Sequence, residues 1–299
     1  MKILNYGSLN IDFVYSVPHF VVGGETLAAS ERRVFPGGKG LNQSIALAKA
    51  GADVYHAGAV GKDGVWLIDL LSQNGVNTKF LQIREDVPTG HAVIQVDESG
   101  QNCIIIDGGA NQSQTDGEVK KTLSNFEAGD MLLLQNEING LHKIIQMAKN
   151  RNITVVLNPS PIDETLLHMP LNMVDIIILN EVEAEAICGE TDCEKQLNAL
   201  KSKFPDTEIV LTQGEKGVAC ETNKNKKYSH GIYKVKAADT TAAGDTFTGF
   251  YMAAKINGLP TEEALKRASA ASAITVSRKG ASVSIPTNDE VDEFLRNRE

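Results

Sequence analysis

Residues 238–249 carry the side chains best suited to chemistry, in the order Ala-Asp-Thr-Thr-Ala-Ala-Gly-Asp-Thr-Phe-Thr-Gly. The small residues from Ala242 to Gly244 let the backbone approach a ligand closely and leave its N–H groups uncovered. Residues 247–256 are apolar at helical spacing, so Asp245 is expected in the first turn of a helix, near the positive end of its dipole. Such a helix start binds anions, and a carboxylate there can accept a proton from a hydroxyl that attacks a phosphate. An ordinary N-capped helix start is the alternative interpretation.

A glycine-rich turn in the N-terminal part of the chain is the second candidate for chemistry. It reads Pro-Gly-Gly-Lys-Gly-Leu-Asn-Gln-Ser over residues 36–44 and leads into an apolar-periodic helix that ends near Gly51. It is not a Walker A loop, because Gly40 follows Lys39 where Ser or Thr would be needed and the upstream glycine is missing. The sequence also lacks a G-x-G-x-x-G fingerprint, which argues against a dinucleotide site. Simple punctuation before a helix is the alternative interpretation of this turn.

Polar residues follow the apolar, strand-like segments along much of the chain. Residues 2–8 are followed by Asn10 and Asp12, and later segments end in Asn158, Asn180 and residues 213–217. In an open parallel sheet such positions gather at the carboxyl edge, where these sheets bind ligands. For Asn10 and Asp12, an Asx-turn that closes the strand is the alternative.

The elements that would position these residues alternate between strand and helix. Buried-strand patterns at residues 54–60, 131–135, 154–157, 174–179 and 209–212 are separated by helical patterns. This alternation predicts an α/β fold, a doubly wound and mostly parallel sheet flanked by helices. Two helix-free segments, residues 13–36 and 90–107, predict a small antiparallel β-sheet that forms a lid over the site. The expected division is therefore residues 1–12, 37–89 and 108–299 for the α/β domain, and residues 13–36 and 90–107 for the lid.

Composition excludes several classes of protein. The chain has 299 residues, 42% of them hydrophobic and 22% charged, and a formal net charge of −9, which argues against nucleic-acid and anionic-membrane partners. No apolar run approaches the roughly 18 residues of a membrane span, and no signal peptide is visible, so we expect a cytoplasmic protein. The scattered histidines form no His-x-x-x-His pair for a metal. The four cysteines are expected to be reduced thiols, with a disulfide between the second and third as the alternative: Cys103, Cys188, Cys193 and Cys220.

Taken together, these motifs resemble the ribokinase-like family of sugar kinases, the phosphofructokinase-B type, over the whole chain. The most specific matches are Gly-Gly-Lys-Gly-Leu-Asn at residues 37–42 and Asp-Thr-Thr-Ala-Ala-Gly-Asp at residues 239–245, in this order. Weaker matches are Asn-Ile-Asp at residues 10–12, Glu137, residues 158–161, Asn180-Glu181 and Arg278-Lys279-Gly280. For the last of these, a basic helix C-terminus is the alternative interpretation.

The resemblance implies an ATP-dependent kinase that phosphorylates the primary 5-hydroxyl of D-ribose to give ribose 5-phosphate. It makes Asp245 the general base and gives the N–H groups of Ala243, Gly244 and Asp245 the role of an anion hole. It assigns the sugar to Asn10, Asp12, Gly38, Lys39, Gly40, Asn42, Glu137 and Asp245. The lid segments at residues 21–24 and 104–109 diverge most from the family, and the lid contacts the sugar. Another substrate of the same family, such as deoxyribose, adenosine or a hexose, therefore remains the alternative.

The resemblance also implies the remaining ligands. It assigns the nucleotide to Asn180, Thr212, Gln213, Gly214, Glu215, Lys216, Gly217, Gly244 and Ser269. Magnesium would arrive with ATP, held mostly by phosphates and water. A monovalent cation, potassium, would be held at Asp239, Thr241, Thr275, Arg278, Gly280 and Ser284.

Exposed strand edges seek partners, so a homodimer through residues 13–36 and 90–107 is expected. The rivals from other classes are a non-catalytic sugar- or nucleotide-binding regulator and a Rossmann dehydrogenase.

Overall fold

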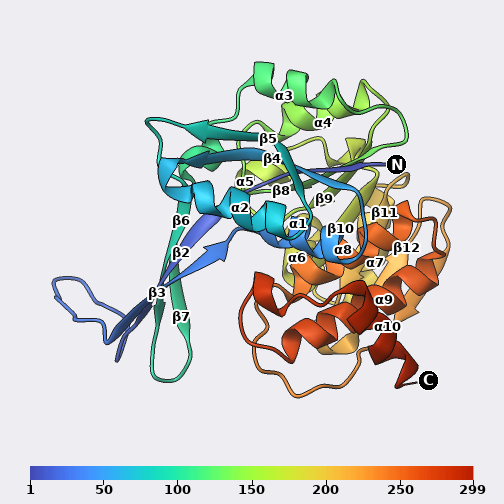
Figure 1. The fold of residues 1–299 in the computed structure, drawn as a ribbon. Helices are drawn as coiled ribbons and strands as arrows, with labels where there is room; N and C mark the ends of the chain where they lie inside the picture. Colours follow the sequence, from blue (N-terminus) through green and yellow to red (C-terminus); the bar gives the residue numbers. More distant parts are fainter. Residues whose placement is uncertain (299) are drawn as a thin grey trace.

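The computed structural model describes residues 1–298, and its centre is a nine-stranded sheet in the order β13-β12-β11-β10-β9-β8-β1-β4-β5 (Figure 1). In this order, each strand from β11 to β5 is parallel to its neighbour. At the other edge, β12 and β13 form a hairpin and β12 pairs antiparallel with β11. The expected mostly parallel sheet is therefore confirmed. Its strands are Ile3–Tyr6 (β1), Val54–Gly61 (β4), Asn77–Arg84 (β5), Met131–Gln135 (β8), Thr154–Asn158 (β9), Ile176–Asn180 (β10), Glu208–Thr212 (β11), Val218–Glu221 (β12) and Lys227–His230 (β13).

Two hydrophobic cores lie on the two faces of this sheet. Successive strand residues point to opposite sides, so Ile3 packs in one core and Leu4 in the other. Leu133 and its neighbour Leu134 in β8 divide in the same way. Because both faces are covered, the central strands read as continuous apolar runs rather than as alternating patterns.

Helices cover both faces, as a doubly wound sheet requires. One core is closed by α1 (Lys39–Lys49), α2 (Val65–Gln73), α8 (Ala243–Ile256), α9 (Thr261–Val276) and α10 (Asn288–Arg296). The opposite core is closed by α3 (Asp116–Leu123), α4 (Leu141–Lys149), α5 (Glu164–Leu167), α6 (Glu181–Cys188) and α7 (Cys193–Lys203). Short 3-10 helices lie at Lys62–Gly64 (η1), Gly109–Gln112 (η2), Leu171–Met173 (η3), Gly214–Lys216 (η4) and Ser282–Ser284 (η5).

A second sheet of four strands, in the order β3-β2-β6-β7, projects from one side of the body (Figure 1). Its strands are Asn10–Ser16 (β2), Glu31–Gly37 (β3), Gly90–Val96 (β6) and Asn102–Asp107 (β7). The two hairpins β2–β3 and β6–β7 are antiparallel, whereas the inner pair β2–β6 runs parallel. The two helix-free segments of the sequence therefore do join in one small sheet. Within the first of these segments, residues 25–27 look strand-like in the sequence, but the structure gives them no strand.

Two further observations bear on the sequence-based expectations. Among residues 1–298, no helix has both the length and the apolar character that crossing a membrane requires. All four cysteines are free thiols, so the alternative of a disulfide between Cys188 and Cys193 does not hold in this structure.

Candidate active site

The N-terminus of α8 lies at the carboxyl edge of the large sheet. Ala242 precedes the helix in the left-handed conformation, with φ 60°, which is rare for a residue with a side chain and costs of order 1 kcal/mol. Asp245 is the third residue of the helix and is 8% exposed. A Cβ added to Gly244 would meet no atom within 4 Å. The helix offers the N–H groups of its first turn no carbonyl of its own, so this turn presents donors to open space. The N–H of Ala243 is an exception, because it donates to the Thr240 carbonyl at 3.2 Å.

Two amide side chains from α1 hold the Asp245 carboxylate. The Asn42 Nδ2 donates to Asp245 Oδ2 at 3.0 Å, and the Gln43 Nε2 donates to Asp245 Oδ1 at 2.9 Å. Asn42 was predicted from the sequence, whereas Gln43 was not. Its position directly after Asn42 on the same helix was the only signal that could have indicated it.

The glycine-rich turn is packed against the end of β1. A Cβ on Gly40 would lie 2.4 Å from the Ser8 backbone nitrogen, and one on Gly37 would lie 2.3 Å from the Asp12 carboxylate. Gly38 has φ +93° and forms the N-cap of α1. Glycines are therefore needed here for close packing on β1 and for room around Asp12.

Glu137 caps the N-terminus of α1 from the loop after β8. Its Oε2 accepts the backbone N–H of Lys39 at 3.0 Å and the hydroxyl of Ser8. Burial raises the pKa of Glu137, although the bond from Ser8 and the charge of Lys39 oppose this. Burial lowers the pKa of Lys39, but the carboxylates of Asp245, Glu137 and Glu183 outweigh it and leave that pKa above its usual value. An ammonium and several carboxylates therefore share one site.

Asn10 and Asp12 come from the first strand of the small sheet, not from the end of β1 as the sequence suggested. Burial, with the nearby charge of Glu137, raises the pKa of Asp12 to about 6. The Asn10 Oδ1 accepts from Asn111 Nδ2 at 2.7 Å. That bond fixes the Asn10 amide so that its NH2 group remains available as a donor. Asn111 is 2% exposed and was missed by the sequence reasoning.

A cavity of about 240 Å³ lies between the N-termini of α1 and α8 and the carboxyl ends of β9, β10 and β11. Six of the predicted residues line it, namely Lys39, Asn180, Thr212, Ala243, Gly244 and Asp245. The other predicted sugar residues do not line it, namely Asn10, Asp12, Gly38, Gly40, Asn42 and Glu137. Asn158 and Glu183 do line it. The sequence placed Asn158 at this edge without giving it a role, and it did not select Glu183. Glu183 forms a reciprocal capping box with Asn180 at the start of α6, and the Asn-x-x-Glu spacing is the sequence signal that could have found it.

The remaining predicted nucleotide residues lie outside the wall of this cavity. Residues 213–217 form the turn after β11, and this turn contains η4. Thr212, the last residue of β11, lines the cavity, and residues 213–217 do not. Gly217 has φ +98°, and a Cβ there would lie 2.2 Å from the His230 carbonyl. This turn is therefore held against the β12–β13 hairpin. Ser269 lies within α9 and is half-buried.

The predicted cation residues are brought together in part. Asp239 accepts from the N–H and hydroxyl of Thr241 with one oxygen, at 2.9 and 2.6 Å, and from the Gly280 N–H with the other, at 3.0 Å. The other three side chains are engaged elsewhere: the Thr275 hydroxyl donates to Thr246, Arg278 pairs with Glu290, and Ser284 donates to the Ala281 carbonyl. Among residues 1–298, no cluster of three or more His, Cys, Asp and Glu side chains could hold a metal ion.

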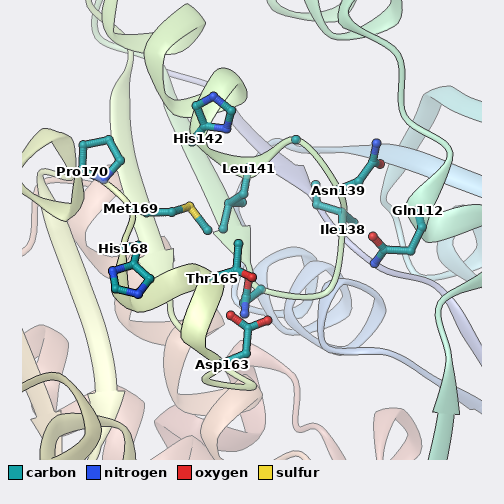
Figure 2. Close-up of a pocket in the computed structure, with 12 residues that line it drawn as sticks. Gln112, Ile138, Asn139, Leu141, His142, Asp163, Thr165, His168, Met169 and Pro170 are labelled. Carbon is teal, nitrogen blue, oxygen red and sulfur yellow. The ribbon is translucent and has the colours of Figure 1, made fainter.

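A larger cavity, of about 510 Å³, lies beside the loop between β8 and α4 (Figure 2). None of the predicted site residues lines it. Its one carboxylate, Asp163, already caps α5 by accepting the Leu166 N–H at 2.8 Å. Asn136 and Gln112 donate to the carbonyls of Pro161 and Glu137. Three of the polar side chains on its wall are thus engaged, whereas the smaller cavity combines Lys39, Asp245 and an open helix N-terminus.

Comparisons with known proteins agree over nearly the full chain. A family model described as pfkB family carbohydrate kinase matches residues 1–288. The ribokinase of Haemophilus influenzae is 38% identical over 298 residues, which cover 97% of this chain and 96% of that protein. The solved ribokinase of Arabidopsis thaliana, complexed with ribose and ATP, has a TM-score of 0.87 at 30% identity, covering 99% of this chain and 98% of that one. The ribokinase of Cryptococcus neoformans, solved with ADP, has a TM-score of 0.86 at 31% identity, covering 98% and 99%.

Proposed function

The chain belongs to the pfkB family of carbohydrate kinases, and on this premise we propose that it transfers a phosphoryl group from ATP to the primary 5-hydroxyl of D-ribose. The products are ribose 5-phosphate and ADP. The family and its full-length relatives make the chain an ATP-dependent sugar kinase. The observation that supports the particular site most is the Asp245 carboxylate on the wall of a cavity shared with Lys39 and an open helix N-terminus.

Asp245 acts as the general base in this proposal. Phosphoryl transfer depends on positioning and on charge stabilisation more than on covalent chemistry. The Asp245 carboxylate takes the proton of the 5-hydroxyl as that hydroxyl becomes acidic during its attack on phosphorus, so its position matters most. The N–H groups of Gly244 and Asp245 lie at the helix start and serve the transferring phosphoryl group, with Ala243 completing the turn. Lys39 adds a positive charge on the same cavity wall.

The sugar is held by groups that meet where β1 ends and β2 begins. Asp12 and the unused Oε1 of Glu137 accept hydroxyl protons, and the Asn10 NH2 group donates. The Asn42 NH2 group already donates to Asp245, so Asn42 offers its unpartnered Oδ1 as a further acceptor. Gly38, Lys39 and Gly40 form the floor of this part of the site. A pentose offers mostly hydroxyl donors, which suits a set rich in carboxylates.

ATP fits on the other side of Asp245. Asn180 and Thr212 line the cavity there, and residues 213–217 with Ser269 extend the nucleotide side beyond it. Magnesium prefers oxygen ligands and accompanies the phosphates of ATP, whose charge it neutralises. Of the carboxylates on the cavity wall, Glu183 is 6% exposed and faces this side. Its hard oxygen donors fit such an ion.

A potassium ion fits the loop of Asp239 and Thr241, which docks at the end of α9. The backbone N–H groups of Ala238 and Asp239 donate to the Val276 carbonyl there. Carbonyl oxygens and one carboxylate are suitable donors for an alkali cation. Because the side chains of Thr275, Arg278 and Ser284 are engaged elsewhere, these residues and Gly280 contribute backbone carbonyls. Binding there would hold the loop that leads into α8.

A homodimer through the lid is the proposed assembly, with residues 13–36 and 90–107 as the lid. The apolar side chains of β3 and β7 are unusually exposed, with Ile105 64%, Ile106 58%, Ile104 48%, Val34 44% and Phe35 40% exposed. Contiguous exposed apolar residues on strands mark interaction surfaces. A second copy of the same sheet would cover them.

The proposed activity is tested by measuring ADP formation from ATP with D-ribose, deoxyribose, fructose and adenosine side by side, with and without potassium. We expect the highest kcat/KM with D-ribose and a stimulation by potassium. If another compound gives a higher kcat/KM than D-ribose, that compound is the preferred substrate and the proposal of ribose is wrong. Failure with every sugar and nucleoside would contradict kinase activity itself.

A further inference from the structure

A chain of buried polar side chains leads from the interior of the large sheet to Asp245, and the proposed mechanism does not use it. Its members come from β1, α1, β4 and β8, and each of them is 0% exposed: Asn5, Gln43, Ser44, His56 and Gln135. Burying five polar side chains is costly unless they serve one another or a ligand. Their hydrogen bonds form one continuous path.

The inner end of this path has a fixed direction. The Gly7 carbonyl can only accept, so the His56 Nε2 at 3.2 Å carries the proton and its Nδ1 is an acceptor. Burial lowers the pKa of His56 to about 4, consistent with a neutral ring. The Ser44 hydroxyl therefore donates to His56 Nδ1 at 2.7 Å and accepts from Asn5 Nδ2 at 2.8 Å. Asn5 Nδ2 also donates to the Gly40 carbonyl at 2.8 Å, which fixes the orientation of this amide.

The orientation of the amides at the outer end of the path follows from the orientation of Asn5 at the inner end. The Asn5 Oδ1 accepts from Gln135 Nε2 at 3.0 Å, and the same Gln135 nitrogen donates to Gln43 Oε1 at 2.7 Å. The oxygen of the Gln43 amide is thereby engaged, so its nitrogen must face outward. That nitrogen donates to Asp245 Oδ1 at 2.9 Å and to Asn158 Oδ1 at 3.0 Å. Two backbone carbonyls thus determine which group meets the carboxylate.

We propose that Gln43 is a positioning residue for Asp245, and that Gln135 and Asn5 hold it in the productive orientation. This inference rests on the proposed role of Asp245. Asn42 and Gln43 each donate to a different carboxylate oxygen, so together they fix the rotation of the carboxylate plane. Asn42 is 6% exposed and is assigned to the sugar in the proposed site, whereas Gln43 is 0% exposed and meets the carboxylate from the buried side.

The pH profile of turnover separates this role from a merely structural one. Amide N–H groups that donate to a carboxylate favour its ionised form. The charged side chains that also face Asp245 are Lys39 on α1, Glu137 after β8 and Glu183 on α6. Replacing Gln43 leaves these three in place, so a shift in the profile reports the lost donor.

The test compares Gln43→Met and Gln135→Met with Gln196→Met. Gln196 is a matched control, because it is also 0% exposed and uses its Nε2 only for the carbonyls of Glu181 and Glu190. For Gln43→Met we expect kcat to fall by roughly 10- to 100-fold, with the KM values for sugar and ATP within about twofold and the acid side of the kcat–pH profile moved to higher pH. Gln135→Met should give the same changes to a smaller extent. Gln196→Met should lower the melting temperature and leave kcat and the profile unchanged.

Gln43→Glu gives an independent signature if the methionine variant fails to fold. The introduced carboxyl keeps the size and the acceptor for Gln135. When protonated it can donate to Asp245, and when ionised it repels it. Its activity relative to the wild type should therefore fall as the pH rises, opposite to Gln43→Met. A wild-type kcat and profile in both Gln43 variants would overturn the inference while leaving the kinase activity in place. Absence of activity in the wild-type protein would instead contradict the proposed function.

Discussion

The two sides of the site are built in different ways. On the body side, β8 is almost wholly buried and Asp245 is held by two amides and a buried polar path. On the side of the small sheet, all six residues of β7 are exposed, and Asp12 is a partly buried carboxylate beside Glu137. The body thus holds the Asp245 carboxylate, our proposed general base, in a fixed orientation without a ligand. The small sheet instead presents exposed apolar strands and a half-buried carboxylate, which we propose are covered by a partner chain and by the sugar.

The space around the glycines also differs between the junction with the body and the far loop of the small sheet. Gly37 and Gly40 lie so close to β1 and Asp12 that any side chain would clash, because the turn fastens the small sheet to the body at this point. Gly23, in the loop between β2 and β3, has no atom within 4 Å of an added Cβ. Substitution should therefore be costly at the junction and tolerated in the loop.

The largest predicted effect belongs to the body side. Asp245→Asn keeps the size of the side chain and should leave the fold and ATP binding intact, but it removes the proton acceptor. We expect kcat to fall by roughly 10²- to 10⁴-fold. Steady-state kinetics, with ATP affinity measured separately, checks this expectation. A turnover near that of the wild type would remove Asp245 from the mechanism.

The buried path should also make the body sensitive to acid. Because burial lowers the pKa of His56 to about 4, the unfolded chain binds a proton to this ring between about pH 6.5 and 4 and the folded protein does not. This contribution to stability is complete above about pH 6.5 and is lost as the pH falls, by about 3 kcal/mol in all. Urea unfolding of wild type and His56→Asn at pH 7 and pH 4 measures it. An equal pH dependence in both proteins would refute this account of His56.

A smaller effect is expected where the small sheet meets the sugar. In the proposed site Asp12 accepts sugar hydroxyls in its ionised form, and burial with the Glu137 charge raises its pKa to about 6 in the free protein. Protonation removes the acceptor, so kcat/KM for the sugar should decline as the pH falls below 6 and be roughly tenfold lower at pH 5 than at its plateau. Asp12→Asn should have a low kcat/KM at every pH, and this kcat/KM should no longer decline below pH 6. A decline that persists unchanged in the variant would assign it to another group.

The smallest effect on chemistry is expected at β7, the exposed edge strand of the small sheet. Ile105→Lys places a charge on the proposed dimer surface and should give a monomer in sedimentation at micromolar concentration. Ile83→Lys is the matched control, since Ile83 is 48% exposed on β5 of the large sheet and should leave the dimer intact. A wild-type protein that sediments as a monomer would contradict the assembly, and so would dissociation by both variants.

Much of the fold could be predicted because local pattern and final structure agree. Met131–Gln135 was predicted with its observed bounds from its apolar run, and β6 and β7 both lie within the helix-free segment predicted at residues 90–107. β12 and β13 were missed because they are only four residues long and carry mixed polarity. The parallel pairing of β2 with β6 depends on contacts between distant segments, which no local pattern encodes.

The site residues also divide into those that a local sequence pattern indicates and those that depend on contacts between distant segments. Asp245 was selected from its residue type at a helix start, and Asn42 was selected through the resemblance; the structure brings these two side chains into contact. Gln43 was not selected, since its importance comes from a hydrogen bond to a residue 202 positions away. Glu183 stands between these cases, because its capping pattern with Asn180 is visible in the sequence but its place on the cavity wall is not.

The most direct test of the whole account is the position of the transferred phosphoryl group. Wild-type protein is incubated with ATP and D-ribose, and the product is examined by phosphorus NMR beside a reaction with 5-deoxy-D-ribose. The account predicts a phosphorus signal coupled to the two protons on C5, and no ADP formation above the sugar-free rate with the 5-deoxy sugar. A phosphate on another carbon, or equal ADP formation with both sugars, would contradict it.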